Sequence, residues 1–304
     1  MDNLPLIANL ELTNRCNIAC KFCAHKSMKR IPMDMDKKMI DLCMQRIDEA
    51  GIRQVTLNTI GETLVAPEWE YALKEAKKRG LLVLISTNGM GLDKKKAEAV
   101  LKNNCDVFRF SVNSIKKEEY EVLHKGASYD KLLKNMSMLK AMRDKMNSKT
   151  DIRVRMVLSG CESEDEKRRL REFWSSYADE AEFVVFGNMG GRNGAEPSTE
   201  GTRTGCRTMK RGINITATGD VTYCPCDFDA ECLVGSIKDL TLQQIWEGER
   251  FASIRDKHDK CDFSSLPQCD FCDATRVDWY QRKSPILSSA EEKIMDSYMK
   301  DWRK

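Results

Sequence analysis

Two kinds of pattern alternate along the first part of the chain: short apolar runs rich in β-branched residues, and longer stretches in which apolar residues recur every three or four positions. The short runs predict six strands, at residues 7–13, 54–60, 81–87, 107–113, 152–158 and 182–187. The longer stretches predict helices at residues 36–50, 67–79, 93–103, 128–146 and 163–177. This alternation predicts an α/β fold in which six βα units with right-handed crossovers form a partial barrel. Ligands of such sheets bind at the carboxyl ends of the strands.

The pattern changes after the sixth strand, where GNMGGRNGAEPSTEGTRTG is too polar and too rich in glycine to pack as a helix or strand. We therefore predict a domain boundary between residues 1–190 and 191–304. Beyond it, GINITATGDVTYC predicts a β-hairpin with a Gly-Asp turn. Helices are predicted at 241–253 and 290–302, so the second unit is a small Cys-rich hairpin and helix domain.

Composition and charge add little to this picture. The chain of 304 residues is 41% hydrophobic and 32% charged, as in a globular protein with a full core, and its net charge is only +3. Such a balance gives no argument for nucleic acid or an anionic membrane as a partner. The segment MDNLPLIANLELT lacks the pattern of a signal peptide, and no window has the roughly 18 consecutive apolar residues of a membrane span. We expect a cytoplasmic protein.

The distribution of the 13 cysteines indicates metal or redox chemistry. Cys16, Cys20 and Cys23 follow the first strand with Cys-x3-Cys-x2-Cys spacing, so three sulfurs converge on one metal centre from a single loop. Four thiolates would saturate an iron–sulfur cubane, whereas three leave one iron open for another ligand. The alternatives are a Cys3His zinc site that includes His25 and three structural cysteines.

Cys-x3-Cys-x2-Cys after the first strand of a βα repeat resembles the radical S-adenosylmethionine (SAM) superfamily. The resemblance implies a partial (β/α)6 barrel, a 4Fe–4S cluster held by Cys16, Cys20 and Cys23, and SAM bound to the open iron. One electron then cleaves a C–S bond of SAM and releases a 5′-deoxyadenosyl radical, which abstracts hydrogen. The resemblance also implies that Phe22 packs near the adenine.

Other positions match the family one at a time. Gly61 and Glu62 resemble the Gly-Gly-Glu motif that binds the methionine amino group of SAM, with Ile60 in place of the first glycine. Thr87 and Asn88, after the third strand, stand where the family commonly places polar residues near the cofactor. Ser111 and Asn113 at the end of the fourth strand, and Arg155 on the fifth, are candidates to bind the ribose or carboxylate of SAM. The alternative for each is a polar residue that is solvated at a strand end.

Seven further cysteines lie between residues 206 and 272. A hairpin plus a remote Cys-x2-Cys pair predicts a four-thiolate site for zinc or an iron–sulfur cluster. The arrangement resembles the SPASM and shorter "twitch" extensions of radical SAM enzymes, which carry auxiliary 4Fe–4S clusters. The resemblance favours one cluster on Cys206, Cys224, Cys269 and Cys272. Cys226, Cys232 and Cys261 remain candidates for a second cluster, and Cys226 for the place of Cys224.

In domain order the chain resembles the twitch-type dehydrogenases that act on 2-deoxy-scyllo-inosamine in aminoglycoside biosynthesis. The resemblance implies oxidation of a carbinol of a sugar or aminocyclitol to a ketone, with the auxiliary cluster as electron acceptor and a flavodoxin- or ferredoxin-type protein as electron donor. Arg192 is the candidate residue to orient the hydroxyl.

Three other functions stay open at this point. An epimerase would use Cys226 to return hydrogen to the substrate radical. A peptide-modifying enzyme is less favoured, because no separate peptide-recognition domain is visible. A structural zinc or iron–sulfur protein is the alternative that is not an enzyme.

Overall fold

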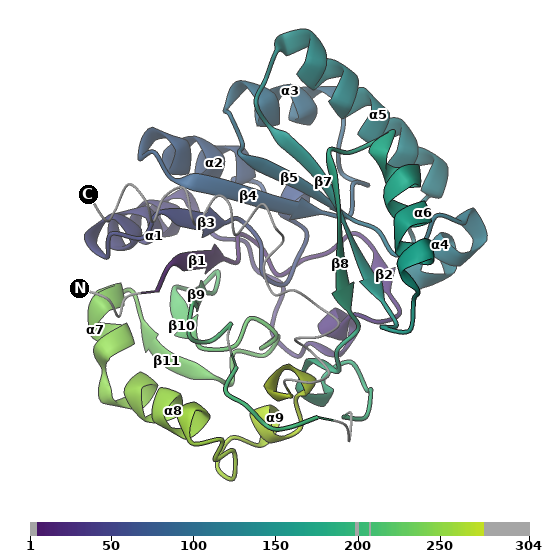
Figure 1. Ribbon diagram of the computed structural model, residues 1–304. Coiled ribbons are helices and arrows are strands. Elements are labelled where there is room, and N and C mark those ends of the chain that lie inside the picture. Colours follow the sequence, from purple (N-terminus) through teal and green to yellow (C-terminus); the bar gives the residue numbers. More distant parts are fainter. Residues whose placement is uncertain (1–4, 198–200, 207, 277–304) are drawn as a thin grey trace, which may run out of the picture.

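The computed structural model describes residues 5–197, 201–206 and 208–276 (Figure 1). Within these residues one sheet of nine strands has the order β11-β10-β9-β1-β3-β4-β5-β7-β8. Its strands are β1 (Ile7–Leu10), β3 (Gln54–Thr56), β4 (Leu82–Thr87), β5 (Val107–Ser111), β7 (Asp151–Leu158), β8 (Glu180–Val185), β9 (Gly212–Ile215), β10 (Asp220–Thr222) and β11 (Leu233–Ser236). The six predicted strands are confirmed, and each pairs in parallel with its neighbours. The fold is therefore the α/β partial barrel that the pattern predicted.

The helices lie mainly along the outside of the curved sheet (Figure 1). They are α1 (Lys37–Glu49), α2 (Trp69–Lys78), α3 (Lys94–Lys102), α4 (Lys117–Leu123), α5 (Tyr129–Met146), α6 (Glu164–Ser175), α7 (Leu242–Glu247), α8 (Glu249–Asp259) and α9 (Pro267–Asp270). Short 3-10 turns are η1 (Ala24–Ser27), η2 (Thr63–Val65), η3 (Met189–Gly191) and η4 (Asp273–Thr275). Side-chain caps begin several helices: Asp36 accepts from the backbone N–H of Met39, and Ser163 forms a capping box with Glu166.

The two faces of the sheet carry different side chains. On β5, Phe108 and Phe110 are fully buried in the apolar core under the helices, whereas the alternate residue Arg109 points to the opposite face. There, Nη1 of Arg109 lies 3.3 Å from Oε2 of Glu182, and Nη1 of Arg153 lies 3.2 Å from Oε1 of the same carboxylate. Burial acts to raise the pKa of Glu182, but the neighbouring guanidinium groups outweigh it and lower that pKa. The interior of the barrel is therefore polar and charge-paired.

The second half of the chain continues the same sheet. The predicted hairpin is confirmed as β9 and β10, with Gly219 at a φ of +84° in its turn. Strand β9 pairs in parallel with β1, with Ile7 opposite Gly212 and Leu10 opposite Ile215. The boundary at 190/191 stays a prediction, but strands from both sides of it belong to one sheet.

One helical prediction differs in extent from the structure, and one helix was missed. The helix predicted at 241–253 is two helices, because Gly248 between α7 and α8 adopts extended dihedral angles of −60° and 148°. Helix α4 was not predicted at all. The helix predicted at 290–302 lies outside the described residues.

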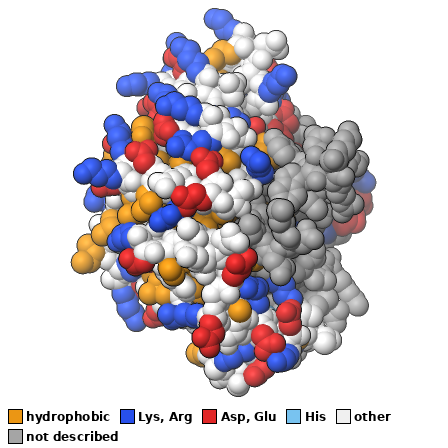
Figure 2. All heavy atoms as spheres, turned by 90° about the vertical axis from the view of Figure 1, so that its left-hand side faces the viewer, with side chains coloured by type: hydrophobic (Ala, Val, Ile, Leu, Met, Phe, Trp, Pro, Cys, Tyr) orange, Lys and Arg blue, Asp and Glu red, His pale blue; other side chains and the backbone are white. Residues whose placement is uncertain are grey.

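On the face drawn in Figure 2, the described residues carry charges of both signs. Over the described part of the face in Figure 2, Lys and Arg side chains are interspersed with Asp and Glu side chains. Pairs such as Lys37–Glu68 and Arg79–Asp48, at 3.6 and 2.9 Å, account for part of this mixture. In the part of the chain that the structure describes, no helix is long and apolar enough to cross a membrane.

Candidate functional site

Cys16, Cys20 and Cys23 lie in a loop that leaves the carboxyl end of β1, and we call residues 13–34 the first cysteine loop. Its ends are joined by the hydroxyl of Thr13, which donates to Oδ1 of Asp34 at 2.6 Å. The buried amide of Asn14 closes it further, since its oxygen accepts from the N–H of Met33 at 2.7 Å and its nitrogen donates to the carbonyl of Ile31 at 2.9 Å. These bonds give the cysteines a fixed frame.

The three thiols are close enough to influence each other's ionisation. Burial raises the pKa of all three, and that of Cys20 reaches about 12 because the charges of Cys23 and Cys16 add to the effect of burial. Within the described residues, no three His, Cys, Asp or Glu side chains yet converge at metal-coordination distance. The three cysteines nevertheless fit a 4Fe–4S cluster, whose iron ions bind thiolates. Burial and the repulsion between the thiolates disfavour ionisation, but the positive charge of the bound iron ions would favour it.

His25 follows Cys23 in η1, but its ring is turned to the backbone. The backbone N–H of His25 donates to Sγ of Cys23 at 3.4 Å. The ring nitrogen Nε2 of His25 lies 2.7 Å from the carbonyl oxygen of Asn14. Because a carbonyl oxygen only accepts, Nε2 carries the proton and donates. This contact disfavours a Cys3His zinc site at that nitrogen.

Gly61 and Glu62 approach the first cysteine loop through the backbone. The N–H of Glu62 donates to the carbonyl of Arg15 at 2.8 Å. A Cβ atom at position 61 would lie 2.3 Å from the carbonyl oxygen of Thr13 and 2.5 Å from that of Arg15, so only glycine fits. The close approach expected of the motif is thus present although Ile60 replaces its first glycine.

The side chain of Glu62 gathers two other predicted residues. Its Oε1 accepts from the hydroxyl of Thr87 at 2.6 Å, and its Oε2 accepts from the N–H of Asn88 at 2.7 Å. The amide of Asn88 continues to Oδ1 of Asn17 at 2.8 Å and lies 3.9 Å from Sγ of Cys16. Burial raises the pKa of Glu62, and the Thr87 hydroxyl and backbone N–H groups oppose that rise. Glu62, Thr87 and Asn88 are buried, and their network extends to the exposed Asn17 beside the first cysteine.

Ser111 is the last residue of β5 and pairs with Arg155, which lies inside β7. Arg155 is engaged by Glu182, whose Oε2 accepts from its Nε at 2.9 Å and pairs with its Nη2 at 2.8 Å. Sequence reasoning missed Glu182, which the register of β7 and β8 sets opposite Arg155. The roles of Ser111 and Arg155 toward SAM stay predictions.

Asn113, Phe22 and Cys20 surround a residue that sequence reasoning also missed, His124. The short strands β2 (Ala19–Cys20) and β6 (His124–Lys125) pair antiparallel and set Cys20 opposite His124. Nδ1 of the imidazole lies 3.2 Å from Sγ of Cys20 and Nε2 lies 3.2 Å from the amide nitrogen of Asn113. The ring of Phe22 meets it edge-on at 5.3 Å. Burial lowers the pKa of His124 to about 4. No local pattern in the sequence could have identified this contact.

The second cysteine region, residues 206–272, brings together thiols from distant parts of the sequence. Cys269 and Cys272 each have a pKa raised to about 12, first by burial and then by the charge of Cys224, with Cys206 contributing to both. The four predicted ligands are thus neighbours: Cys206, Cys224, Cys269 and Cys272. They offer the four-thiolate donor set of an iron–sulfur cluster.

Of the three remaining cysteines, two belong to this group and one does not. The neighbouring thiol of Cys226, followed by burial, raises the pKa of Cys224. Cys232 is buried, and its Sγ donates to Oε1 of Gln268 at 2.5 Å. Cys261 is exposed and contacts the carbonyl of Arg203 at 3.5 Å.

Arg192 lies at the second cysteine region. Its Nη2 is 3.2 Å from Oδ1 of the fully buried Asp227 and 3.9 Å from Sγ of Cys232. Asp227 also accepts from the N–H of Cys232 at 2.7 Å, so it fixes both partners. The predicted role of Arg192 toward a substrate hydroxyl stays a prediction.

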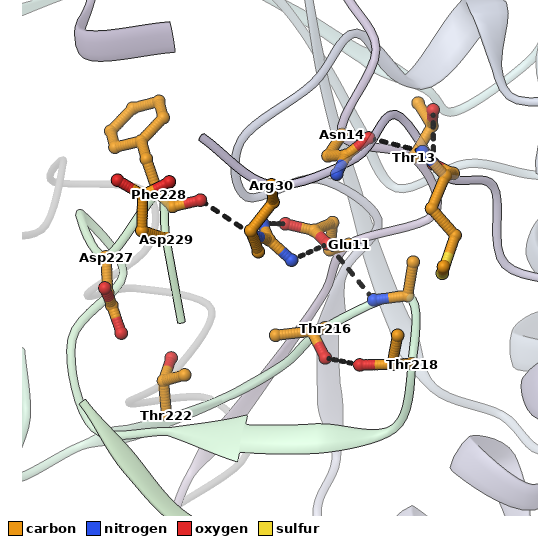
Figure 3. Close-up of polar contacts among 12 residues, drawn as sticks. Glu11, Thr13, Asn14, Arg30, Thr216, Thr218, Thr222, Asp227, Phe228 and Asp229 are labelled. Carbon is orange, nitrogen blue, oxygen red and sulfur yellow. Dashed lines mark hydrogen bonds and ion pairs between the residues drawn. The ribbon is translucent and has the colours of Figure 1, made fainter. Parts of the chain in front are cut away.

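Arg30 connects the two cysteine regions (Figure 3). Its guanidinium donates to both carboxylate oxygens of Glu11, at 2.9 and 2.5 Å, and its Nε donates to the carbonyl of Phe228 at 2.7 Å. Glu11 is almost fully buried and also accepts from the N–H of Ala217, in the turn between β9 and β10, at 3.1 Å. Next to Arg30, the N–H of Lys29 donates to Asp229 at 2.6 Å. The first cysteine loop therefore rests directly on the second region.

Two family models match the chain. The model of the radical SAM superfamily matches residues 10–166, and that of SPASM, an iron–sulfur cluster-binding domain, matches residues 206–273. The first match includes the first cysteine loop, and the second includes all the cysteines gathered around Cys224.

Individual relatives are similar over different extents. The cofactor-modifying protein of tungsten-containing aldehyde ferredoxin oxidoreductase from Pyrococcus furiosus is 32% identical over 108 residues, which are 34% of this chain and 30% of that protein. The chain thus spans about a third of the length of this curated relative.

Two solved structures share the fold over most of this chain. BtrN in complex with AdoMet and 2-DOIA has a TM-score of 0.63 at 17% identity, covering 90% of this chain and 94% of that chain. SuiB of Streptococcus suis bound to precursor peptide SuiA has a TM-score of 0.67 at 14% identity, covering 90% and 70%.

Proposed function

Because the chain belongs to the radical SAM superfamily, we propose that it is an oxidoreductase that converts a carbinol of a sugar or aminocyclitol into a ketone. The observation that carries this proposal is the bridge from Arg30 to Glu11 and to the carbonyl of Phe228. This bridge holds the first cysteine loop at a fixed position relative to the second cysteine region. An enzyme that passes an electron from its substrate to an auxiliary cluster needs such a fixed arrangement of its two cluster sites.

Membership of the superfamily and the SPASM match define the cofactors. The enzyme carries a 4Fe–4S cluster that binds SAM, and auxiliary iron–sulfur clusters. We assign the first to the first cysteine loop and the auxiliary clusters to the second cysteine region. The choice left open between zinc and iron–sulfur is thereby decided for iron–sulfur. When bound, these groups supply a 5′-deoxyadenosyl radical that takes a hydrogen atom and a cluster that accepts an electron.

In the proposed reaction the substrate carbon loses one hydrogen atom, its hydroxyl loses one proton, and one electron leaves the substrate. The hydrogen atom leaves in 5′-deoxyadenosine, the other product of SAM being methionine, and the C–O single bond becomes a carbonyl. The hydroxyl proton passes to solvent water, and the electron would pass to the auxiliary cluster. The electron that starts the reaction is expected from a flavodoxin- or ferredoxin-type donor. Every atom and electron of the two-hydrogen oxidation is then accounted for.

The chain's own residues support each part of this reaction. We propose that Glu62, which accepts hydrogen bonds from Thr87 and Asn88, binds the amino group of SAM. Arg192 and Asp227 pair at the auxiliary thiols, where we propose that Arg192 orients the substrate hydroxyl for proton loss. The likeness to BtrN, solved with 2-DOIA, extends over nearly the whole of both chains and supports a small-molecule substrate.

A second candidate function is peptide modification. It is supported by the likeness to SuiB, which was solved with its precursor peptide. Epimerisation with Cys226 as hydrogen donor is the third, and the influence of the Cys226 thiol on the pKa of Cys224, a predicted ligand, supports it.

The mass of the product distinguishes these functions. Anaerobically reconstituted enzyme is incubated with SAM, a reductant and candidate aminocyclitols, sugars and peptides in D2O. We expect an aminocyclitol or sugar that has lost two hydrogens, and Cys226→Ala should retain this activity. An unchanged covalent structure with one solvent deuterium, lost in Cys226→Ala, would instead establish epimerisation. A modified peptide as the sole product would contradict the small-molecule proposal.

A further inference from the structure

The first cysteine loop is held by a segment far from it in sequence. Cys20 and His124, which are 104 residues apart, face each other across the pair of short strands β2 and β6. The backbone of the loop is also bound there, since the N–H of Lys21 donates to the carbonyl of Leu123 at 2.9 Å. The position of Cys20 relative to His124 is therefore set by backbone pairing as well as by side chains.

The hydrogen bonds around His124 identify which ring nitrogen carries the proton. The backbone N–H of Val157 donates to Oδ1 of Asn113 at 2.7 Å, which fixes that atom of the amide as the oxygen. The amide nitrogen of Asn113 therefore faces Nε2 of His124 at 3.2 Å and donates to it. Because Nε2 is an acceptor, the proton of the ring lies on Nδ1, which is 3.2 Å from Sγ of Cys20.

The imidazole is also fixed by its packing. It is 1% exposed, it stacks on Tyr120 with a centroid distance of 4.5 Å and an interplanar angle of 24°, and it meets Phe22 at 84°. A ring held on its faces and edges cannot turn its donor away from the sulfur without displacing an aromatic neighbour. The N–H group is thus aimed at the sulfur before any cluster is bound.

We propose that His124 is a positioning residue whose Nδ1–H donates a hydrogen bond to the Cys20 thiolate and makes the SAM-binding cluster easier to reduce. Hydrogen bonds to the sulfurs are among the factors that set the potentials of iron–sulfur clusters. Reduction adds negative charge that is shared by the sulfurs, so a donor stabilises the reduced cluster more than the oxidised one. His124 acts through Cys20 and is not itself a ligand.

The test is a redox titration of the reconstituted enzyme monitored by EPR, in which the SAM-binding cluster is recognised by the change of its signal when SAM is added. His124→Phe keeps an aromatic ring but removes the donor. Its equilibrium constant for reduction should fall about tenfold, which is a shift of about 59 mV to lower potential for one electron. His124→Asn, which retains an N–H near the position of Nδ1, should shift less.

The matched control is His25→Phe, because the His25 ring bonds the carbonyl of Asn14 and not a sulfur. Its potential should equal that of the wild type. A wild-type potential in His124→Phe, or an equal shift in both Phe variants, would overturn the proposal.

A measurement on the unaltered holoenzyme avoids the case in which His124→Phe does not fold. The chain contains three histidines, so 15N NMR of the histidine-labelled enzyme with oxidised clusters can be assigned by single variants. We expect His124 as the Nδ1–H tautomer. The Nε2–H tautomer would leave no donor toward Cys20 and would refute the inference.

Discussion

The two cysteine regions are built in opposite ways. The first takes three cysteines from eight consecutive residues, and its loop is closed by bonds such as that between Thr13 and Asp34. The second collects thiols from a segment of 67 residues, inclusive of 206 and 272, through a hairpin, a turn centred on Asp227 and the short helix α9. The local site can be recognised from spacing alone, whereas the assembled site exists only in the folded chain.

One buried histidine contacts each region, His124 at the first and His258 at the second, and the two are used differently. Nδ1 of His124 faces the sulfur of Cys20, whereas Nδ1 of His258 accepts from the backbone N–H of Cys206 at 3.1 Å. One ring therefore acts on a ligand atom, and the other acts on the backbone that carries a ligand. We therefore expect His124 to affect the reduction potential of the cluster at the first region, and His258 to stabilise the backbone conformation around Cys206 in the second.

The largest effect that distinguishes the regions is the loss of a ligand. Cys16→Ala should abolish SAM cleavage and remove the iron of one cluster, while the auxiliary iron remains. Cys272→Ala should lower the iron content comparably but leave SAM cleavage measurable. Iron analysis and assay of 5′-deoxyadenosine check both, and loss of all iron in Cys16→Ala would show that the regions are not independent.

A smaller effect is expected at the bridge between the regions. Arg30→Met leaves the buried carboxylate of Glu11 without its charged partner, so the free energy of unfolding should fall by about 3 kcal/mol. The variant Lys102→Met at the exposed pair Lys102–Glu98 should change it by less than about 0.5 kcal/mol. Urea unfolding of the iron-free proteins provides the comparison, and equal losses in the two variants would argue against a structural bridge.

The pH dependence of stability tests the structural use of His258. Burial lowers its pKa to about 4, whereas an unperturbed histidine titrates near about 6.5. The unfolded chain therefore takes up the proton first, so the stabilising contribution is complete above about pH 6.5 and is lost as the pH falls toward 4. Between pH 6.5 and 5 the free energy of unfolding should fall by about 2 kcal/mol, and His258→Asn should show a shallower pH dependence by that amount. Identical pH profiles would contradict the assigned shift.

The smallest effect is predicted for Cys261→Ser. This thiol is exposed and contacts only backbone carbonyl oxygens, those of Arg203 and His258, in the described structure. Iron content and SAM cleavage should remain at the wild-type level, whereas Cys272→Ser should lose iron. Loss of iron in Cys261→Ser would contradict this prediction, because it would identify Cys261 as a ligand of an iron–sulfur cluster.

Much of the fold and part of the site could be predicted from the sequence because their signals are local. The six parallel strands follow from short apolar runs, and the first cysteine loop follows from the spacing of three residues. Gly61 and Glu62 were found because two consecutive residues after the second strand resemble the Gly-Gly-Glu motif of the family.

The parts that were missed depend on long-range contacts. His124 is set against Cys20 by strands only two residues long, and no hydrophobic period marks such a pair. Glu182 acquires its role from the register that places it beside Arg155, and Arg30 from a loop that folds back on Glu11. The pairing of β9 with β1 likewise joins two units that the polar connection between them suggested were separate.

The central claim is that the first region makes the radical and the second receives the electron. It is tested most directly by measuring 5′-deoxyadenosine and the oxidised product together, in the wild type and in Cys272→Ala. We predict equal amounts in the wild type, and 5′-deoxyadenosine without ketone in the variant. A wild-type yield of ketone in Cys272→Ala would contradict the claim.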